Sequence, residues 1–304
     1  MAQSNGGIRH SFGLIFPVSD PDRFLVWLSM AAYGLAALYG IVRLLRRKPG
    51  TRTVTYPLIF VGFLLQTAGL YLRGMQYGAC PLGNTFEVVQ FIVWSTTFLF
   101  LVIGPVFQVH LLGTATAALV TATGLISLLV PNWDYPHTST LFGGDPLIEF
   151  HAAVSIFSYG IFGLLSTVAI LYLIQYNALE RKWRSRIFAL LPSIVKLDNL
   201  ARRLLSAGIL VLTLAFLSGL MVWFDEAWEA LHWKLLTVAI LWLGYGVVWI
   251  MRLRQRFSPH RAAICFLTLY LFALFSLWPV SRSHDSKDQE SPPSTEHLTP
   301  PTSK

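Results

Sequence analysis

Eight long apolar segments constrain this chain more than any other feature of its sequence. A helix needs about 20 mostly apolar residues to cross the hydrocarbon core of a bilayer, and each segment is close to that length or longer. The segments are Phe24–Leu45, Thr55–Leu72, Phe86–Phe107, Leu111–Val130, Leu147–Tyr176, Leu204–Phe224, Leu235–Met251 and Ala262–Val280. Transmembrane β-strands would be about half as long and would alternate apolar with polar residues. The sequence therefore predicts an all-α fold, a polytopic membrane helix bundle with eight transmembrane helices.

The scarcity of charge agrees with a membrane protein. Charged residues make up 12% of the chain, whereas soluble domains carry about 25%. The first residues hold no apolar segment of the kind found in cleavable signal peptides, so we expect the first span to be a permanent helix. We predict an external N-terminal segment at residues 1–23, a membrane domain at 24–280, and a disordered external tail at 281–304, which is polar and rich in proline and serine.

The basic residues predict the orientation of the bundle. Most of the 23 lysines and arginines fall in the connections after the first, fifth and seventh spans. They are Arg43, Arg46, Arg47, Lys48 and Arg52, then Arg181, Lys182, Arg184, Arg186, Lys196, Arg202 and Arg203, and last Arg252, Arg254, Arg256 and Arg261. By the positive-inside rule these connections are cytoplasmic, so both termini are expected to be extracytoplasmic. Basic residues confined to such connections leave no soluble face for a nucleic acid, and we expect no such partner.

The stretch between the sixth and seventh spans, VWFDEAWEALHWK at residues 222–234, is rich in aromatic and ionisable side chains. It carries Trp223, Trp228 and Trp233, with His232 directly before Trp233 and Lys234 directly after it. Three indoles and an imidazole at a membrane surface could form a platform for a flat, apolar, iron-bearing ring. Each indole alone also fits an ordinary interfacial belt, because tryptophan collects at headgroup level in many membrane proteins.

Two histidines are predicted at the same outer face. His151 opens the fifth span and His232 precedes the seventh. Neutral imidazole is a common axial ligand of haem iron. We therefore expect His151 and His232 to bind the iron of one haem from opposite faces, with the indoles at its rim. A cation for a propionate would come from Lys234 or Arg73.

Other ionisable residues leave alternatives open. Glu87 lies within the third span, where ionisable groups are rare and suggest function, so we count it among the predicted cofactor contacts. Glu87 is also the one feature that favours a small-solute transporter. His10 and His137 are predicted outside and are alternative ligands. The two cysteines form no CxxC pair, which argues against disulfide exchange and a structural zinc site.

Three further stretches carry a family resemblance that extends from the third span to the eighth. GNTFEVVQFIVW contains an Asn-x-x-Glu segment ahead of an aromatic run. DPLIEFHAAVSIFSYGIFGLLSTVAILYLIQ opens with an external histidine, His151, and continues Ser-x-x-x-Tyr. LPSIVKLDNLARRLLSAGILVLTLAFLSGLMVW combines a Leu-Asp-x-Leu loop with a Ser-Gly helix. These residues resemble the cytochrome c assembly family of CcsA and ResC, and most closely its shorter HemX- and YpjD-type members.

The tryptophan-bearing stretch is similar to the haem-handling segment of that family, but it is shorter. Trp223 and Trp228 match a Val-Trp-x-x-Glu-Ala-Trp pattern, and Lys234 and Tyr245 keep the family spacing. His-Trp-Lys stands where the family has Trp-x-Trp-Asp-Pro. Ile250 stands where full-length members have a further histidine, five positions after the tyrosine. The resemblance therefore implies a haem-handling or accessory protein rather than a complete haem lyase.

What the resemblance implies is a haem-binding protein of cytochrome c assembly in the bacterial plasma (inner) membrane, holding haem on the extracytoplasmic side. Its expected partners are membrane lipid, other assembly proteins and an apocytochrome with a CxxCH motif. The alternative is a cofactor-free scaffold or regulator, like HemX-type proteins associated with tetrapyrrole synthesis. In that case the basic connection 181–203 would be the working surface. The same basic residues also fit simple control of topology.

Overall fold

The computed structural model confirms an all-helical chain. The helices are α1 (Pro21–Leu45), α2 (Arg52–Tyr77), α3 (Thr85–Phe107), α4 (Leu112–Leu129), the short 3-10 helix η1 (Pro131–Trp133), α5 (Pro146–Glu180), α6 (Ile194–Val222), α7 (His232–Leu253) and α8 (Pro259–Asp288). The structure describes residues 20–46, 48, 52–78, 80–107, 111–134, 146–181, 192–222 and 232–288. For residues 146, 220–222, 232–235 and 277–288 it describes the backbone alone. Within these ranges there is no strand. Eight of the helices are long and apolar enough to cross a membrane, as the sequence predicts.

The boundaries of two helices differ from the apolar segments. α6 begins at Ile194, ten residues before the predicted start, and its first turns bury Leu197, Leu200 and Leu204. These leucines follow helical spacing, so one apolar face extends the helix while charged residues occupy the other face. Such an amphipathic turn lowers the average hydropathy, and a search for apolar runs misses it. α8 continues to Asp288, into the stretch predicted as a disordered tail, of which residues 289–304 lie outside the described residues.

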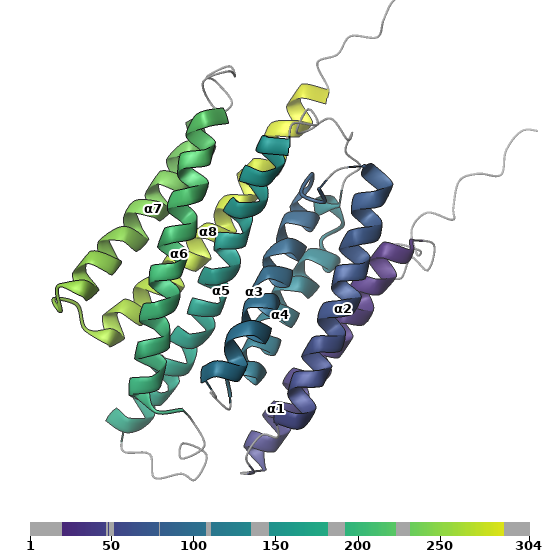
Figure 1. Ribbon diagram of the computed structural model, residues 1–304. Coiled ribbons are helices and arrows are strands. Elements are labelled where there is room, and N and C mark those ends of the chain that lie inside the picture. Colours follow the sequence, from purple (N-terminus) through teal and green to yellow (C-terminus); the bar gives the residue numbers. More distant parts are fainter. Residues whose placement is uncertain are drawn as a thin grey trace, which may run out of the picture.

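Successive helices alternate in direction, and the bundle has two groups (Figure 1). In the first group α1 packs on α2 and α4, and α3 packs on α2 and α4. In the second group α5 packs on α6 and α8, while α7 contacts α6 and α8. The groups meet chiefly where α3 packs on α5. The last turns of α2, α4 and α6 and the first turns of α3, α5 and α7 lie at one end, which we name the outer end because the charge pattern predicts it to be extracytoplasmic.

Small residues bring neighbouring helices close together. Gly124 of α4 packs on Met30 of α1, and Gly160 of α5 packs on Ser95 of α3. A side chain at either glycine would overlap its neighbour. Membrane helices associate through such close packing because lipid offers no hydrophobic drive between them. These contacts fix the spacing of the helices that carry the outer-end residues.

Candidate functional site

His151 lies near the start of α5, at the outer end, and faces α6. Its Nδ1 is 3.0 Å from Oγ of Ser218. The Ser218 hydroxyl also lies 2.9 Å from the Ala215 carbonyl, to which it can donate its proton while it accepts a hydrogen bond from His151. In that arrangement Nδ1 carries the imidazole proton, and Nε2 keeps a lone pair. This is the tautomer of a metal-binding histidine whose second nitrogen is held by the protein.

A glycine allows the imidazole to approach the α6 backbone. A Cβ added at Gly219 would lie 2.7 Å from Cε1 of His151 and 3.3 Å from Nε2. Any larger residue would displace the ring. The Ser-Gly pair of this helix is visible in the sequence, but its contact with His151 is not, because Ser218 follows His151 by 67 residues and lies in another helix.

The remaining predicted site residues follow α6 or open α7 in the sequence. α6 ends at Val222 and α7 begins at His232, so the tryptophan-bearing stretch joins the outer ends of these two helices. Trp223 and Trp228 lie outside the described residues, as do the side chains of His232, Trp233 and Lys234. His10 and His137 also lie outside the described residues. The structure thus brings His151 to the helix that leads into this stretch.

Glu87 belongs to a different place, a buried cluster of ion pairs at the outer end of α1–α4. Its side chain is 0% exposed. Oε1 accepts a hydrogen bond from Nε of Arg73 at 2.6 Å, and Oε2 accepts one from the Gly83 amide at 2.7 Å. Both oxygens are thus engaged within the protein. We therefore assign Glu87 to this cluster rather than to a haem contact.

Arg73 is the centre of the same cluster. Nη1 donates to Asp22 at 2.9 Å, and Nη2 forms an ion pair with Asp134. With Glu87, three carboxylates from α1, α3 and the end of η1 bind one guanidinium, whose planar fork suits such pairing. The prediction that Arg73 serves a haem propionate is therefore wrong, because its donors already have anionic partners. Lys234 stays as the predicted cation for that role.

A chain of buried hydrogen bonds continues from this cluster into the membrane. The Tyr33 hydroxyl donates to Oε1 of Gln66 at 2.9 Å, and Nε2 of Gln66 donates to Oε1 of Gln90 at 2.8 Å. Nε2 of Gln90 then donates to Ser127 at 2.9 Å. One polar chain thus links α1, α2, α3 and α4. Gln90 of α3 thus bonds to residues of two neighbouring helices, as expected because buried amides must be paired in lipid.

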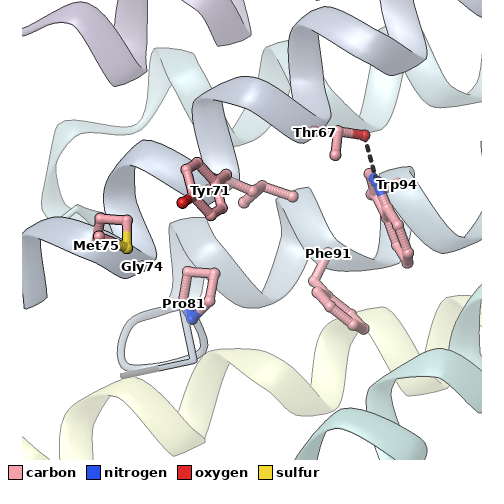
Figure 2. Close-up of a pocket in the computed structure, with 8 residues that line it drawn as sticks. Thr67, Tyr71, Gly74, Met75, Pro81, Phe91 and Trp94 are labelled. Carbon is pink, nitrogen blue, oxygen red and sulfur yellow. Dashed lines mark hydrogen bonds between the residues drawn. The ribbon is translucent and has the colours of Figure 1, made fainter. Parts of the chain in front are cut away.

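An apolar groove opens between α2 and α3, on the side of α3 that carries Trp94 (Figure 2). Its volume is about 290 Å³. It is lined by Thr67, Leu70, Tyr71, Gly74, Met75, Pro81, Phe91 and Trp94. Nε1 of Trp94 donates to Thr67 at 2.8 Å, and its ring stacks on Phe98. Among the described residues no charged side chain lines the groove, so none of them would hold a propionate there.

The basic connection of the alternative hypothesis is partly helical. Arg202 and Arg203 lie in α6. Arg202 pairs with Asp198 at 3.2 Å, and Arg203 lies 5.3 Å above the ring of Phe107. Arg203 is therefore held against α3, whereas Arg202 pairs within α6 and stays largely exposed. Residues 182–191 of this connection lie outside the described residues.

The fold and the outer end define a class of protein: a multi-pass membrane protein with a histidine held by a helix pair at one membrane face. The chain belongs to the cytochrome c assembly protein family, whose model matches residues 82–281. This range covers α3 to α8 and therefore includes His151, Ser218 and His232.

Several relatives support the same family. The HemX protein of Bacillus subtilis (strain 168) is 26% identical over 266 residues, covering 84% of this chain and 95% of that protein. The cytochrome c biogenesis protein CcsA of Synechococcus sp. (strain CC9902) is 28% identical over 240 residues, covering 68% of this chain and 76% of the relative. CcsA of Chlamydomonas reinhardtii is 27% identical over 241 residues, covering 74% of this chain and 65% of the relative.

Proposed function

We propose that this protein binds haem at the extracytoplasmic face of the bacterial plasma membrane and holds it during cytochrome c assembly. His151 and His232 would bind the haem iron. Trp223, Trp228 and Trp233 contact the porphyrin. Lys234 pairs with a propionate.

The observation that supports this proposal best is the hydrogen bonding of His151. When Ser218 accepts a hydrogen bond from Nδ1–H, the Nε2 lone pair can bind iron. Axial histidines need such a partner on the other nitrogen, which fixes both the tautomer and the direction of the ring. Family membership adds that the same protein class assembles c-type cytochromes. His151 thus fits the group that the family implies.

The residues of this protein would hold the haem and present it to the apocytochrome. When bound, haem supplies the vinyl groups to which the cysteines of an apocytochrome CxxCH motif add. The two imidazoles would set the height and tilt of the ring at the membrane surface. The indoles would exclude water from its apolar face, because they bury large apolar area there. Assembly partners and the apocytochrome would meet the protein at this outer face.

The test is an absorption spectrum of the full chain purified in detergent from haem-replete cells. We expect a Soret band with the features of two imidazole ligands. His151→Ala and His232→Ala should each change the ligand signature, and the double variant should abolish the band. His260→Ala is the matched control, because His260 packs on Tyr176 at the opposite end of the bundle, with the ring centroids 4.3 Å apart. A colourless wild-type protein, or a double variant with an unaltered band, refutes the proposal.

A further inference from the structure

Two indole groups on α7 form matching hydrogen bonds with α6. Nε1 of Trp242 donates to Oγ1 of Thr213 at 2.9 Å, and Nε1 of Trp249 donates to Oγ of Ser206 at 2.9 Å. From the first pair to the second, both helices advance by seven residues toward the inner end. The two bonds therefore share one antiparallel register between α6 and α7.

These bonds matter because α7 is the least buried of the eight described spans. Only 17% of the residues in its membrane-spanning stretch are buried, compared with 72% in α5. In lipid no hydrophobic drive holds helices together, so directional contacts decide how they align. At the inner end Arg252 of α7 forms an ion pair with Asp198 of α6. Polar contacts thus follow the α6–α7 pair from its middle to its inner end.

The same register can be continued to the outer end. It sets Thr237 of α7 opposite Ser218, the residue that holds His151, and Trp233 opposite Val222. The backbone of His232 then lies five residues beyond the level of Ser218, which at the rise of an α-helix is about 7.5 Å outward. A shift of one turn would move it by about 5.4 Å. Ligand groups must be held within about 0.5 Å of their productive geometry.

We propose that Trp242 and Trp249 are positioning residues, which fix the register of α7 on α6 and so hold His232 at the height where it shares haem with His151. This inference rests on the proposed function. The indoles do not touch the haem in this arrangement, and they act through the helix that carries the ligand. If they served only as general contacts between helices, their loss would lower stability without altering the ligands of the iron.

The register is measured first, without reference to haem. In a background that has both native cysteines, Cys80 and Cys265, changed to serine, Leu217→Cys is combined with Val238→Cys. These positions are opposite each other in the proposed register, four residues outward from the Thr213–Trp242 pair. Leu210→Cys with Val238→Cys is the displaced control, about 10 Å out of register along the axis. We expect oxidation to link the first pair efficiently and the second pair poorly.

The positioning variant is Trp242→Phe with Trp249→Phe, which keeps aromatic packing and removes both donors. We expect the matched cross-link to fall several-fold and the absorption spectrum to shift from two imidazole ligands to one. Trp94→Phe is the control, because Trp94 donates the equivalent bond to Thr67 between α2 and α3. It should leave both measurements unchanged. If the double variant does not fold, Thr213→Val with Ser206→Ala removes the two hydrogen-bond acceptors instead. The same cross-link and absorption spectrum are then measured, with the same expected results.

The outcomes are distinguishable. A variant that keeps the matched cross-link and the two-imidazole spectrum overturns the inference. A variant that loses the cross-link but keeps the spectrum shows that the register does not position His232, and also overturns it. A wild-type protein without haem refutes the proposed function and the purpose assigned to the register, while the cross-link still tests whether Trp242 and Trp249 set that register.

Discussion

The substitution Gly219→Ala adds a single methyl group beside the proposed iron ligand. The new Cβ would lie 2.7 Å from Cε1 of His151, whereas ordinary van der Waals contact begins at 3.4 Å. The ring must therefore retreat by about 0.7 Å to restore that contact. The bond from Nδ1 to Ser218, now 3.0 Å, would then stretch beyond the usual range of about 2.7–3.2 Å for such bonds.

The expected effects on folding and on haem binding differ in size. Loss of one hydrogen bond lowers the free energy of unfolding by about 0.5–1.5 kcal/mol. Alanine in place of glycine within a helix recovers about 1 kcal/mol, so the net stability should hardly change. Removing the partner that orients a metal ligand lowers metal affinity about 10–100-fold. We therefore expect a folded protein with weak haem binding.

Haem titration of the apoprotein, followed at the Soret band, measures the affinity, and thermal unfolding in detergent measures the stability. Gly246→Ala is the matched control, because no atom lies within 4 Å of a Cβ added there. It should leave haem affinity unchanged. If Gly219→Ala binds haem with the wild-type affinity and spectrum, then His151 does not bind iron in the orientation described, and the reasoning from Ser218 is wrong.

Three further predictions concern the outer half of the molecule. Arg73→Met removes the guanidinium shared by three buried carboxylates, of which Asp134 also pairs with Arg23 at 3.4 Å, and should lower the free energy of unfolding by about 3–5 kcal/mol; an unchanged melting temperature would contradict this role. Gln66→Leu removes the hydrogen-bond partner of both Tyr33 and Gln90 and should lower the free energy of unfolding by about 1–3 kcal/mol. An unchanged free energy of unfolding would show that these hydrogen bonds contribute nothing to stability. Burial raises the pKa of the Cys80 thiol to about 11, with Glu149 and Glu87 adding to the shift. Because the thiolate is the reactive form, maleimide labelling of Cys80, with the other cysteine replaced by serine, should accelerate about tenfold per pH unit from pH 7 to 10; a plateau below pH 9 would refute it.

The sequence by itself determined the class of fold. Apolar length is a local property of the chain, and a bilayer demands about 20 such residues for each crossing, so the eight helices could be read directly. The start of α6 could not, because its first turns are amphipathic and their apolar face is defined only by the neighbours that bury it. His151 could be placed near the start of its helix for the same local reason.

Only the tertiary structure decided which polar groups meet. In a membrane helix most faces are apolar, so periodicity says little about which face contacts which neighbour. Arg73 and Glu87 therefore looked available for a cofactor, yet long-range packing pairs them with each other. The same packing brings Ser218 to within 3.0 Å of Nδ1 of His151, where its oxygen can accept a hydrogen bond from the ring. Residue spacing within one helix contains no information about such contacts, because they depend on the register and rotation of two helices distant in sequence.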